Sequence, residues 1–212
     1  MPALAIAVFS DVICPWCYLG KRRLESALDR LGLRETTTVT WLPYELNPAM
    51  PPEGMERMAY REAKFGLAKA VQLDAQMTAL GEAEGVAFAF GRQTRTPSTR
   101  RAHKLIAHAT RLGNADPVVE ALFHAYFEEA RDIGDPAVLR EIAAGAGLDR
   151  DAAMAAMEDD LLDRQVAELE AEAGESGISG VPFFIIDGQW AVSGAQPPEQ
   201  WVEALTGLGA TA

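Results

Sequence analysis

Residues 10–21 read SDVICPWCYLGK and contain both cysteines of this 212-residue chain, Cys14 and Cys17. Two cysteines placed at random in such a chain would fall three positions apart only about one time in a hundred. A disulfide between them closes so small a ring that it hardly constrains the unfolded chain, which excludes a structural staple. A zinc site needs two further ligands, and the three histidines lack the required paired spacing. We therefore predict a redox-active pair and no metal site.

The segments around this pair predict a strand, a helix and a second strand. Residues 4–9 (LAIAVF) form a short apolar run of the kind found in buried strands. Pro15 occupies the first position of the following helix, where its missing N–H has no cost, and Gly32 is suited to end that helix. Residues 37–42 (TTVTWL) are rich in strand-forming residues. This order predicts a βαβ unit in a parallel sheet.

The rest of the chain changes from a helical pattern of residues to a strand pattern. After the prolines at positions 48, 51 and 52, a helical pattern rich in Ala, Leu, Met and Glu begins near Gly54. A strand pattern returns at residues 183–186, and Asp187-Gly188 is a strong signal for a hairpin turn. We therefore predict an α/β fold in three parts. Residues 1–48 form a βαβ part, residues 49–160 form an all-helical insertion, and residues 161–212 form a part with a helix, a hairpin and a last helix.

Composition and charge exclude several classes of protein. The chain is 49% hydrophobic and 24% charged, as globular proteins are, which excludes disorder and fibrous repeats. No apolar run approaches the roughly 18 to 20 residues of a membrane helix. The net charge of −12 argues against nucleic acid or an anionic membrane as a partner. The apolar N-terminus has no basic residue before Lys21, so we expect no secretory signal and a cytoplasmic location.

A cysteine at the start of a helix gains a specific reactivity. The unpaired N–H groups and the partial positive charge of a helix N-terminus favour thiolate over thiol at Cys14. Cys17, one turn further along, is placed to attack a mixed disulfide formed by Cys14. We expect Cys14 to be the exposed nucleophile and Cys17 the more buried resolving thiol. Trp16 and Tyr18 are expected to line an apolar patch beside the sulfurs, as a surface that receives unfolded peptide requires.

These motifs resemble those of a known family. Cys14-Pro15-Trp16-Cys17 resembles the active-site motif of the thioredoxin superfamily, and Val181-Pro182, after Gly180 and before a hydrophobic strand, resembles its cis-proline loop. The whole chain, with its helical insertion, is similar to the DsbA family. Four segments resemble the FrnE-like branch of that family: residues 10–21, Glu45-Leu46-Asn47-Pro48, Arg101-Ala102-His103 and residues 191–196.

The resemblance implies a thioredoxin fold with a large all-helical insertion domain, and dithiol–disulfide exchange as the chemistry. It implies that Cys14 is the nucleophile and that Cys17 resolves, with Pro15 and Trp16 completing the active-site motif. It also implies a cis peptide bond at Val181–Pro182, facing the disulfide, where the Val181 backbone pairs with an extended substrate. The implied partners are disulfide-containing or unfolded polypeptides, or small thiols. No bound cofactor is expected, and glutathione is a candidate co-substrate.

A second function belongs to a different class. The DsbA-like set includes 2-hydroxychromene-2-carboxylate isomerases and kappa-class glutathione transferases, which use glutathione and act on small aromatic compounds. Those enzymes typically present a serine in place of the first cysteine of the motif. Cys14 and Cys17 are both intact here, which favours the redox function.

The roles of several other residues can also be predicted. Many thioredoxin-fold enzymes keep a buried acid six residues before the nucleophile, but Val8 holds that position here. Asp11 is closer to the cysteines in the sequence and is an alternative for that role, but a turn aspartate is more often a solvated or capping residue. The cations at residues 21–23 either add positive potential near the thiolate or are solvated. Met55 and Met58 are expected in the core of the helical part rather than in a substrate-binding patch.

Overall fold

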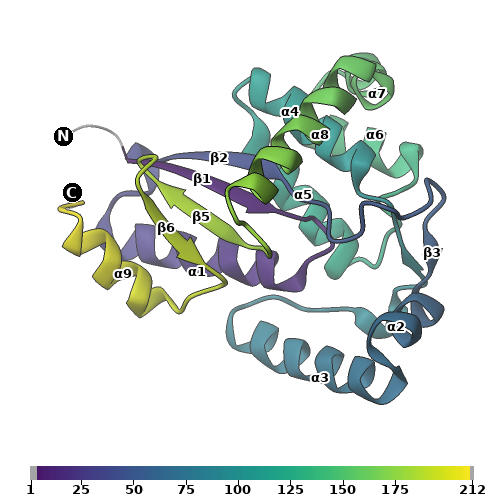
Figure 1. The fold of residues 1–212 in the computed structure, drawn as a ribbon, viewed down its shortest axis with the longest axis horizontal. Helices are drawn as coiled ribbons and strands as arrows, with labels where there is room; N and C mark the ends of the chain where they lie inside the picture. Colours follow the sequence, from purple (N-terminus) through teal and green to yellow (C-terminus); the bar gives the residue numbers. More distant parts are fainter. Residues whose placement is uncertain (1–3, 211–212) are drawn as a thin grey trace.

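A four-stranded mixed sheet lies at the centre of the computed structural model, which describes residues 4–210 (Figure 1). The strand order is β2-β1-β5-β6. β1 and β2 are parallel, whereas β1 with β5 and β5 with β6 are antiparallel. The four strands are β1 (Ala5–Ser10), β2 (Thr38–Pro43), β5 (Phe183–Ile186) and β6 (Trp190–Ser193). The first half of the sheet thus comes from the start of the chain and the second half from its end.

Two helices complete this α/β part. α1 (Pro15–Leu31) connects β1 to β2, and Gly32 ends it in the left-handed conformation with φ of 67°. α9 (Pro198–Gly207) packs against α1. Trp201 of α9 lies edge-on to Phe184 of β5, with ring centroids 4.8 Å apart. This packing fixes the C-terminal hairpin and α9 against the N-terminal βαβ unit.

The long middle of the chain is helical, as its pattern predicts (Figure 1). A short pair of antiparallel strands, β3 (Met55–Glu56) and β4 (Arg95–Thr96), was not expected, because two-residue strands leave no periodicity in a sequence. The seven α-helices are α2 (Arg57–Phe65), α3 (Leu67–Ala83), α4 (Arg100–Arg111), α5 (Ala115–Phe127), α6 (Pro136–Gly145), α7 (Arg150–Glu158) and α8 (Asp160–Glu175). Two single 3-10 turns are η1 (Arg34–Thr36) and η2 (Phe90–Arg92).

The helical segment packs directly onto the sheet. Helices α4, α5 and α8 all contact β2. One hydrophobic cluster includes Ile6 and Leu19 from the first part of the chain, Leu105 and Phe123 from the helices, and Trp201 near the end. The sheet and the helices therefore share one continuous core.

The predicted thioredoxin fold with a helical insertion is confirmed. The expected strands, the helix after Cys14 and the C-terminal hairpin all appear. The hairpin turn residues Asp187 and Gly188 both have positive φ, 50° and 67°, as tight hairpin turns require. Within residues 4–210, no helix combines the length and the apolar character needed to cross a membrane.

Candidate active site

Both cysteines lie at the N-terminus of α1, and both are free thiols. Cys14 is the N-cap residue, and its carbonyl accepts hydrogen bonds from the backbone N–H groups of Cys17 and Tyr18 at 3.0 and 3.3 Å. Cys14 is 4% exposed and Cys17 is 1% exposed. The expectation of an exposed Cys14 is wrong, because the cavity described below, rather than open surface, borders this residue.

Burial raises the pKa of the Cys17 thiol well above its ordinary value. Cys14 adds to this shift through a hydrogen bond and its charge, whereas the Ser10 hydroxyl and the Asp11 backbone oppose it. Cys17 is therefore a thiol at neutral pH, and its reaction requires that a proton be removed.

The Val181–Pro182 peptide bond is cis. The Cys14 thiol donates to the Val181 carbonyl, with 3.7 Å between Sγ and the oxygen. α1 presses closely on this loop, since a Cβ at Gly20 would lie 2.9 Å from Cγ of Pro182. Residues separated by 167 positions in the sequence thus meet at the sulfur.

A cavity of about 410 Å³ lies beside Cys14, within the usual range of small-molecule sites. Pro15, Trp16 and Val181 form part of its wall, and Trp16 is 37% exposed. The rest of the lining comes from α2, α3, the segment around η2 and the end of α5, and its aromatic residues are Tyr60, Phe65, Phe90, Tyr126 and Phe127. The cavity therefore joins the dithiol to the helical part of the molecule.

The cavity carries more positive than negative charge. Arg57, Arg61 and Lys64 of α2 line it, and Asp74 of α3 bridges the two arginines at 2.8 and 2.6 Å. The side-chain N–H groups Nε of Arg61 and Nδ2 of Asn47 are buried without an acceptor among residues 4–210. Burial lowers the pKa of Arg61, Asp74 opposes the shift and Arg57 adds to it. These donors and charges suit a carboxylate-bearing ligand.

Sequence reasoning missed these cationic residues. Arg57, Arg61 and Lys64 recur at positions i, i+4 and i+7, which places them on one face of a helix. That spacing was a usable signal, although it does not reveal what the face contacts.

Asp11 is not the solvated or merely capping residue that its turn position favours. It is completely buried, and its carboxylate accepts hydrogen bonds from the backbone N–H groups of Leu46 at 2.8 Å and Ile13 at 3.4 Å. Nε2 of His103, from α4, lies 3.5 Å from Oδ1 of Asp11. His103 was not singled out as a site residue, because a lone histidine on a helix gives no sign of its partner.

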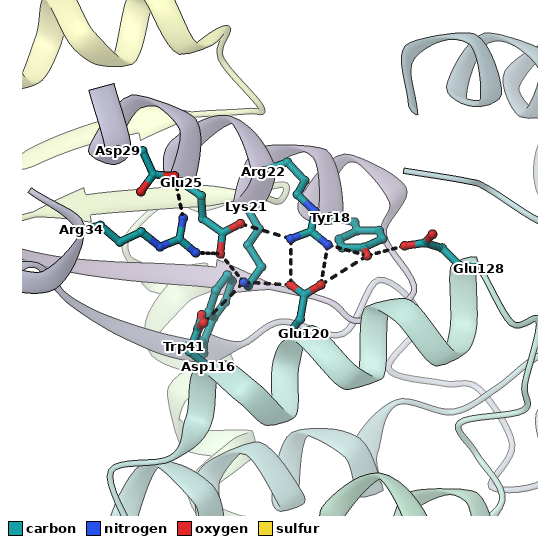
Figure 2. Close-up of polar contacts among 10 residues, drawn as sticks. All are labelled: Tyr18, Lys21, Arg22, Glu25, Asp29, Arg34, Trp41, Asp116, Glu120 and Glu128. Carbon is teal, nitrogen blue, oxygen red and sulfur yellow. Dashed lines mark hydrogen bonds and ion pairs between the residues drawn. The ribbon is translucent and has the colours of Figure 1, made fainter. Parts of the chain in front are cut away.

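Tyr18, Lys21 and Arg22 point toward acidic residues of the helical part (Figure 2). Tyr18 is completely buried, stacks on Phe123 with centroids 5.0 Å apart, and donates to Glu128 at 2.6 Å. Lys21 is 3% exposed among the carboxylates of α1 and α5. Tyr18 therefore does not line an apolar patch beside the sulfurs, and Lys21 is neither solvated nor directed at the thiolate.

Two methionines also differ from expectation. Met55 is 37% exposed and Met58 is 42% exposed, so neither belongs to the core of the helical part. Met55 lies in β3 and Met58 in the first turn of α2. The short β3–β4 pair places Met55 in a strand, a constraint that the helical pattern alone does not contain.

Comparison with known proteins agrees with this architecture. The family model described as "DSBA-like thioredoxin domain" matches residues 5–206. The chain therefore belongs to the DsbA-like thioredoxin family. A probable DsbA oxidoreductase from Streptomyces coelicolor is 32% identical, with a TM-score of 0.87 over 99% of this chain and 92% of the other.

Two more distant structures share the fold alone. The cytosolic disulfide reductase DsbM from Pseudomonas aeruginosa, solved with GSH, is 18% identical, with a TM-score of 0.65 over 96% of this chain and 98% of the other. A 2-hydroxychromene-2-carboxylate isomerase is 16% identical, with a TM-score of 0.69 over 97% of this chain and 94% of the other. Because this fold serves both activities, the site has to distinguish between them.

Proposed function

We propose that this protein is a thiol–disulfide oxidoreductase that exchanges disulfides through Cys14 and Cys17. The observation that supports this most directly is the Cys14 thiol at the start of α1, beside the Val181 carbonyl and bordering the cavity. A helix N-terminus stabilises the thiolate that attacks, and Cys17 lies one turn away to complete the exchange.

The exchange proceeds through two attacks. The Cys14 thiolate attacks one sulfur of the substrate disulfide, forming a mixed disulfide and releasing the other sulfur as a thiolate. Cys17 loses its proton and attacks Cys14, so that the Cys14–Cys17 bond forms and the second substrate thiolate leaves. The substrate disulfide is reduced by two electrons and the dithiol is oxidised. Two equivalents of a small thiol restore the dithiol by the reverse steps.

Substitution of each cysteine tests the proposal. Cys14→Ser is expected to abolish disulfide exchange, because no other thiol borders the cavity. Cys17→Ser is expected to accumulate mixed disulfides at Cys14, because the resolving thiol is gone. Turnover is measured with a disulfide substrate and a thiol reductant, and adducts are measured by intact-protein mass spectrometry. Normal disulfide turnover by Cys14→Ser would contradict the proposal.

We propose that a small acidic thiol, with glutathione as the probe, is the co-substrate that enters the cavity. The excess of cations and the unpartnered N–H groups of Asn47 and Arg61 support a ligand with carboxylates. Polypeptide substrates are proposed to meet the Val181 backbone, where strand-like pairing requires only main-chain groups.

The cavity cation nearest the surface provides the test. Lys64 is exposed and donates to Asn47 Oδ1 at 2.8 Å and Tyr60 Oη at 2.7 Å, so Lys64→Gln leaves the fold intact. We expect the KM for glutathione to rise about tenfold with kcat little changed, because one charged contact contributes roughly 1.5 kcal/mol. Lys69→Gln, also exposed but outside the cavity lining, is the control. Equal KM values for the two variants would exclude a role for Lys64.

The cytoplasm is the proposed compartment. The distant neighbour DsbM is described as cytosolic, and the cytosol maintains dithiols in the reduced state. A reduced Cys14 is the form that attacks disulfides, so a reductase or isomerase would be ready to act there.

A further inference from the structure

The proposed exchange requires a group that accepts the proton of Cys17, and Val8 cannot be that group. The Cys17 thiol has to lose its proton before it attacks, yet burial holds the proton on the sulfur. Val8, where many thioredoxin-fold enzymes carry an acid, is an apolar residue that is 1% exposed. Some other group has to accept the proton.

A buried polar cluster lies next to Cys17. The Ser10 hydroxyl and the Asp11 backbone both lower the pKa of Cys17 against the effect of burial, and so favour its thiolate. Ser10 Oγ is buried and has no hydrogen-bond partner among residues 4–210, so it is free to donate to that thiolate. Asp11 also carries a completely buried carboxylate, which the Leu46 N–H holds in place at 2.8 Å.

His103 continues the cluster beyond Asp11. Its ring is buried, and Nε2 lies 3.5 Å from Asp11 Oδ1 without a hydrogen bond to any described residue. Burial opposes a charge on His103, but Asp11, Glu45 and Glu170 outweigh it and raise the pKa of the imidazole. Leu46, whose N–H bonds the Asp11 carboxylate, directly follows Glu45 in the chain, so Glu45 lies close to the Asp11–His103 pair.

Glu45 connects His103 to the surface. Its side chain is 5% exposed, and it pairs with Arg100 at 2.7 Å. Arg100 also contacts Glu170 and the 44%-exposed Asp163, both at 3.0 Å. Burial, with Glu170 adding to its effect, raises the pKa of Glu45 to about 7, where a carboxylate accepts and releases protons readily.

We propose that Asp11, His103 and Glu45 form a proton relay for the resolving cysteine, in place of the acid absent at Val8. Asp11 accepts the proton of the Cys17 thiol and passes it to His103, and His103 releases one proton to the Glu45 carboxylate. Asp11 and His103 thereby return to their starting protonation states, and Glu45 ends as the carboxylic acid. The Cys17 thiolate then attacks Cys14 and releases the substrate thiolate. The charged and titratable groups that face the relay are Cys17 of α1, Arg100 of α4, Tyr126 of α5 and Glu170 of α8.

This inference rests on the proposed exchange, and one experiment separates the two. An aromatic disulfide that releases coloured thionitrobenzoate is mixed with the full-length reduced protein in a stopped-flow instrument. Attack by Cys14 releases the first equivalent, and attack by Cys17 releases the second. Absence of the first phase in the wild type would refute the exchange itself. Only the second phase reports on the relay.

His103→Asn is expected to leave the first phase unchanged and to slow the second by at least about tenfold at pH 7. The second phase should recover the wild-type rate at high pH, where Cys17 ionises without help. His108→Asn, on the same helix but outside the cluster, is the control. A second phase with the wild-type pH profile, or one slowed equally at every pH, would overturn the relay.

Glu45→Gln provides a second test of the relay if His103→Asn does not fold. Glu45→Gln keeps the shape of the side chain and removes the final proton acceptor. We expect the same loss of the second phase near pH 7 and the same recovery at high pH. A wild-type second phase in folded Glu45→Gln would exclude Glu45 from the relay and leave the proton no route to the surface.

Discussion

At the scale of single residues, burial decides which groups have unusual chemistry. Cys17 and Glu45 both lie away from solvent, and burial raises the pKa of each. Asp11, which the sequence places in an ordinary turn, is enclosed between β1, the segment after β2 and α4. The chemistry of the site therefore depends on polar residues that the apolar core surrounds.

Glu45 makes the stability of the protein depend on pH. Its pKa is raised from 4.5 to about 7, so between these values the folded protein holds a proton that the unfolded chain has released. The free energy of unfolding therefore falls as pH rises through this window, by up to about 3 kcal/mol, and then levels off. Glu45→Gln should remove this contribution and flatten the decline.

Urea unfolding at pH 5 and pH 8 measures this difference. The exposed Glu168→Gln, on α8, serves as the control and should keep the wild-type difference between the two pH values. If Glu45→Gln loses as much stability between pH 5 and pH 8 as the wild type does, the raised pKa of Glu45 is refuted.

At the scale of elements, the approach of α1 to the cis-proline loop sets the geometry around Cys14. Gly20 faces this loop, and no larger residue fits there without a shift, because an added Cβ would lie 2.9 Å from Pro182 Cγ and 3.4 Å from Phe184 Cζ. A glycine within a helix normally costs stability relative to alanine. Here it allows the helix and the loop to meet.

Gly20→Ala is therefore expected to destabilise the protein by about 1 to 3 kcal/mol, since overpacking outweighs the gain in helix propensity. Displacement of Pro182 should also slow exchange at Cys14. Gly174→Ala, within α8, is the matched control, because no atom lies within 4 Å of its added Cβ. That control should gain about 0.5 to 1 kcal/mol. Equal effects of the two substitutions on urea unfolding would show that the close approach is unimportant.

At the scale of the whole molecule, an ion cluster around the buried Lys21 joins α1 to α5 (Figure 2). Lys21 contacts Glu25 at 2.5 Å, Glu120 at 2.9 Å and Asp116 at 3.4 Å. Asp116 also accepts from Trp41 Nε1 of β2 at 3.1 Å. These contacts connect the thioredoxin part with the helical part and so hold the wall of the cavity in place relative to Cys14.

Lys21→Met should destabilise the protein by about 2 to 3 kcal/mol, because three carboxylates lose their shared cation. The estimate is below that for a fully buried pair, since Asp116 and Glu120 are 48% and 31% exposed. The control is Arg30→Met, which breaks an exposed pair with Glu199 and should cost less than about 1 kcal/mol. Urea unfolding measures both, and a loss no greater for Lys21→Met than for Arg30→Met would contradict this role.

Much of the fold could be predicted from local sequence. The strand before Cys14, the helix that begins at Pro15 and the turn at Asp187-Gly188 depend on propensities, capping and spacing within a few residues. The Cys14–Cys17 spacing likewise identified the thiol chemistry to be tested. Such features are encoded locally because backbone preferences and helix ends act over one or two turns.

Only the tertiary structure decided which distant residues surround the cysteines. The pairing of Asp11 with His103, the position of Arg61 beside the cavity and the burial of Lys21 each join separate elements. No local preference specifies these contacts, because they follow from the packing of α4, α2 and α5 around one core. Local sequence encodes the βαβ unit and the dithiol. Packing determines which groups around that dithiol are buried, and burial sets their charge and proton affinity.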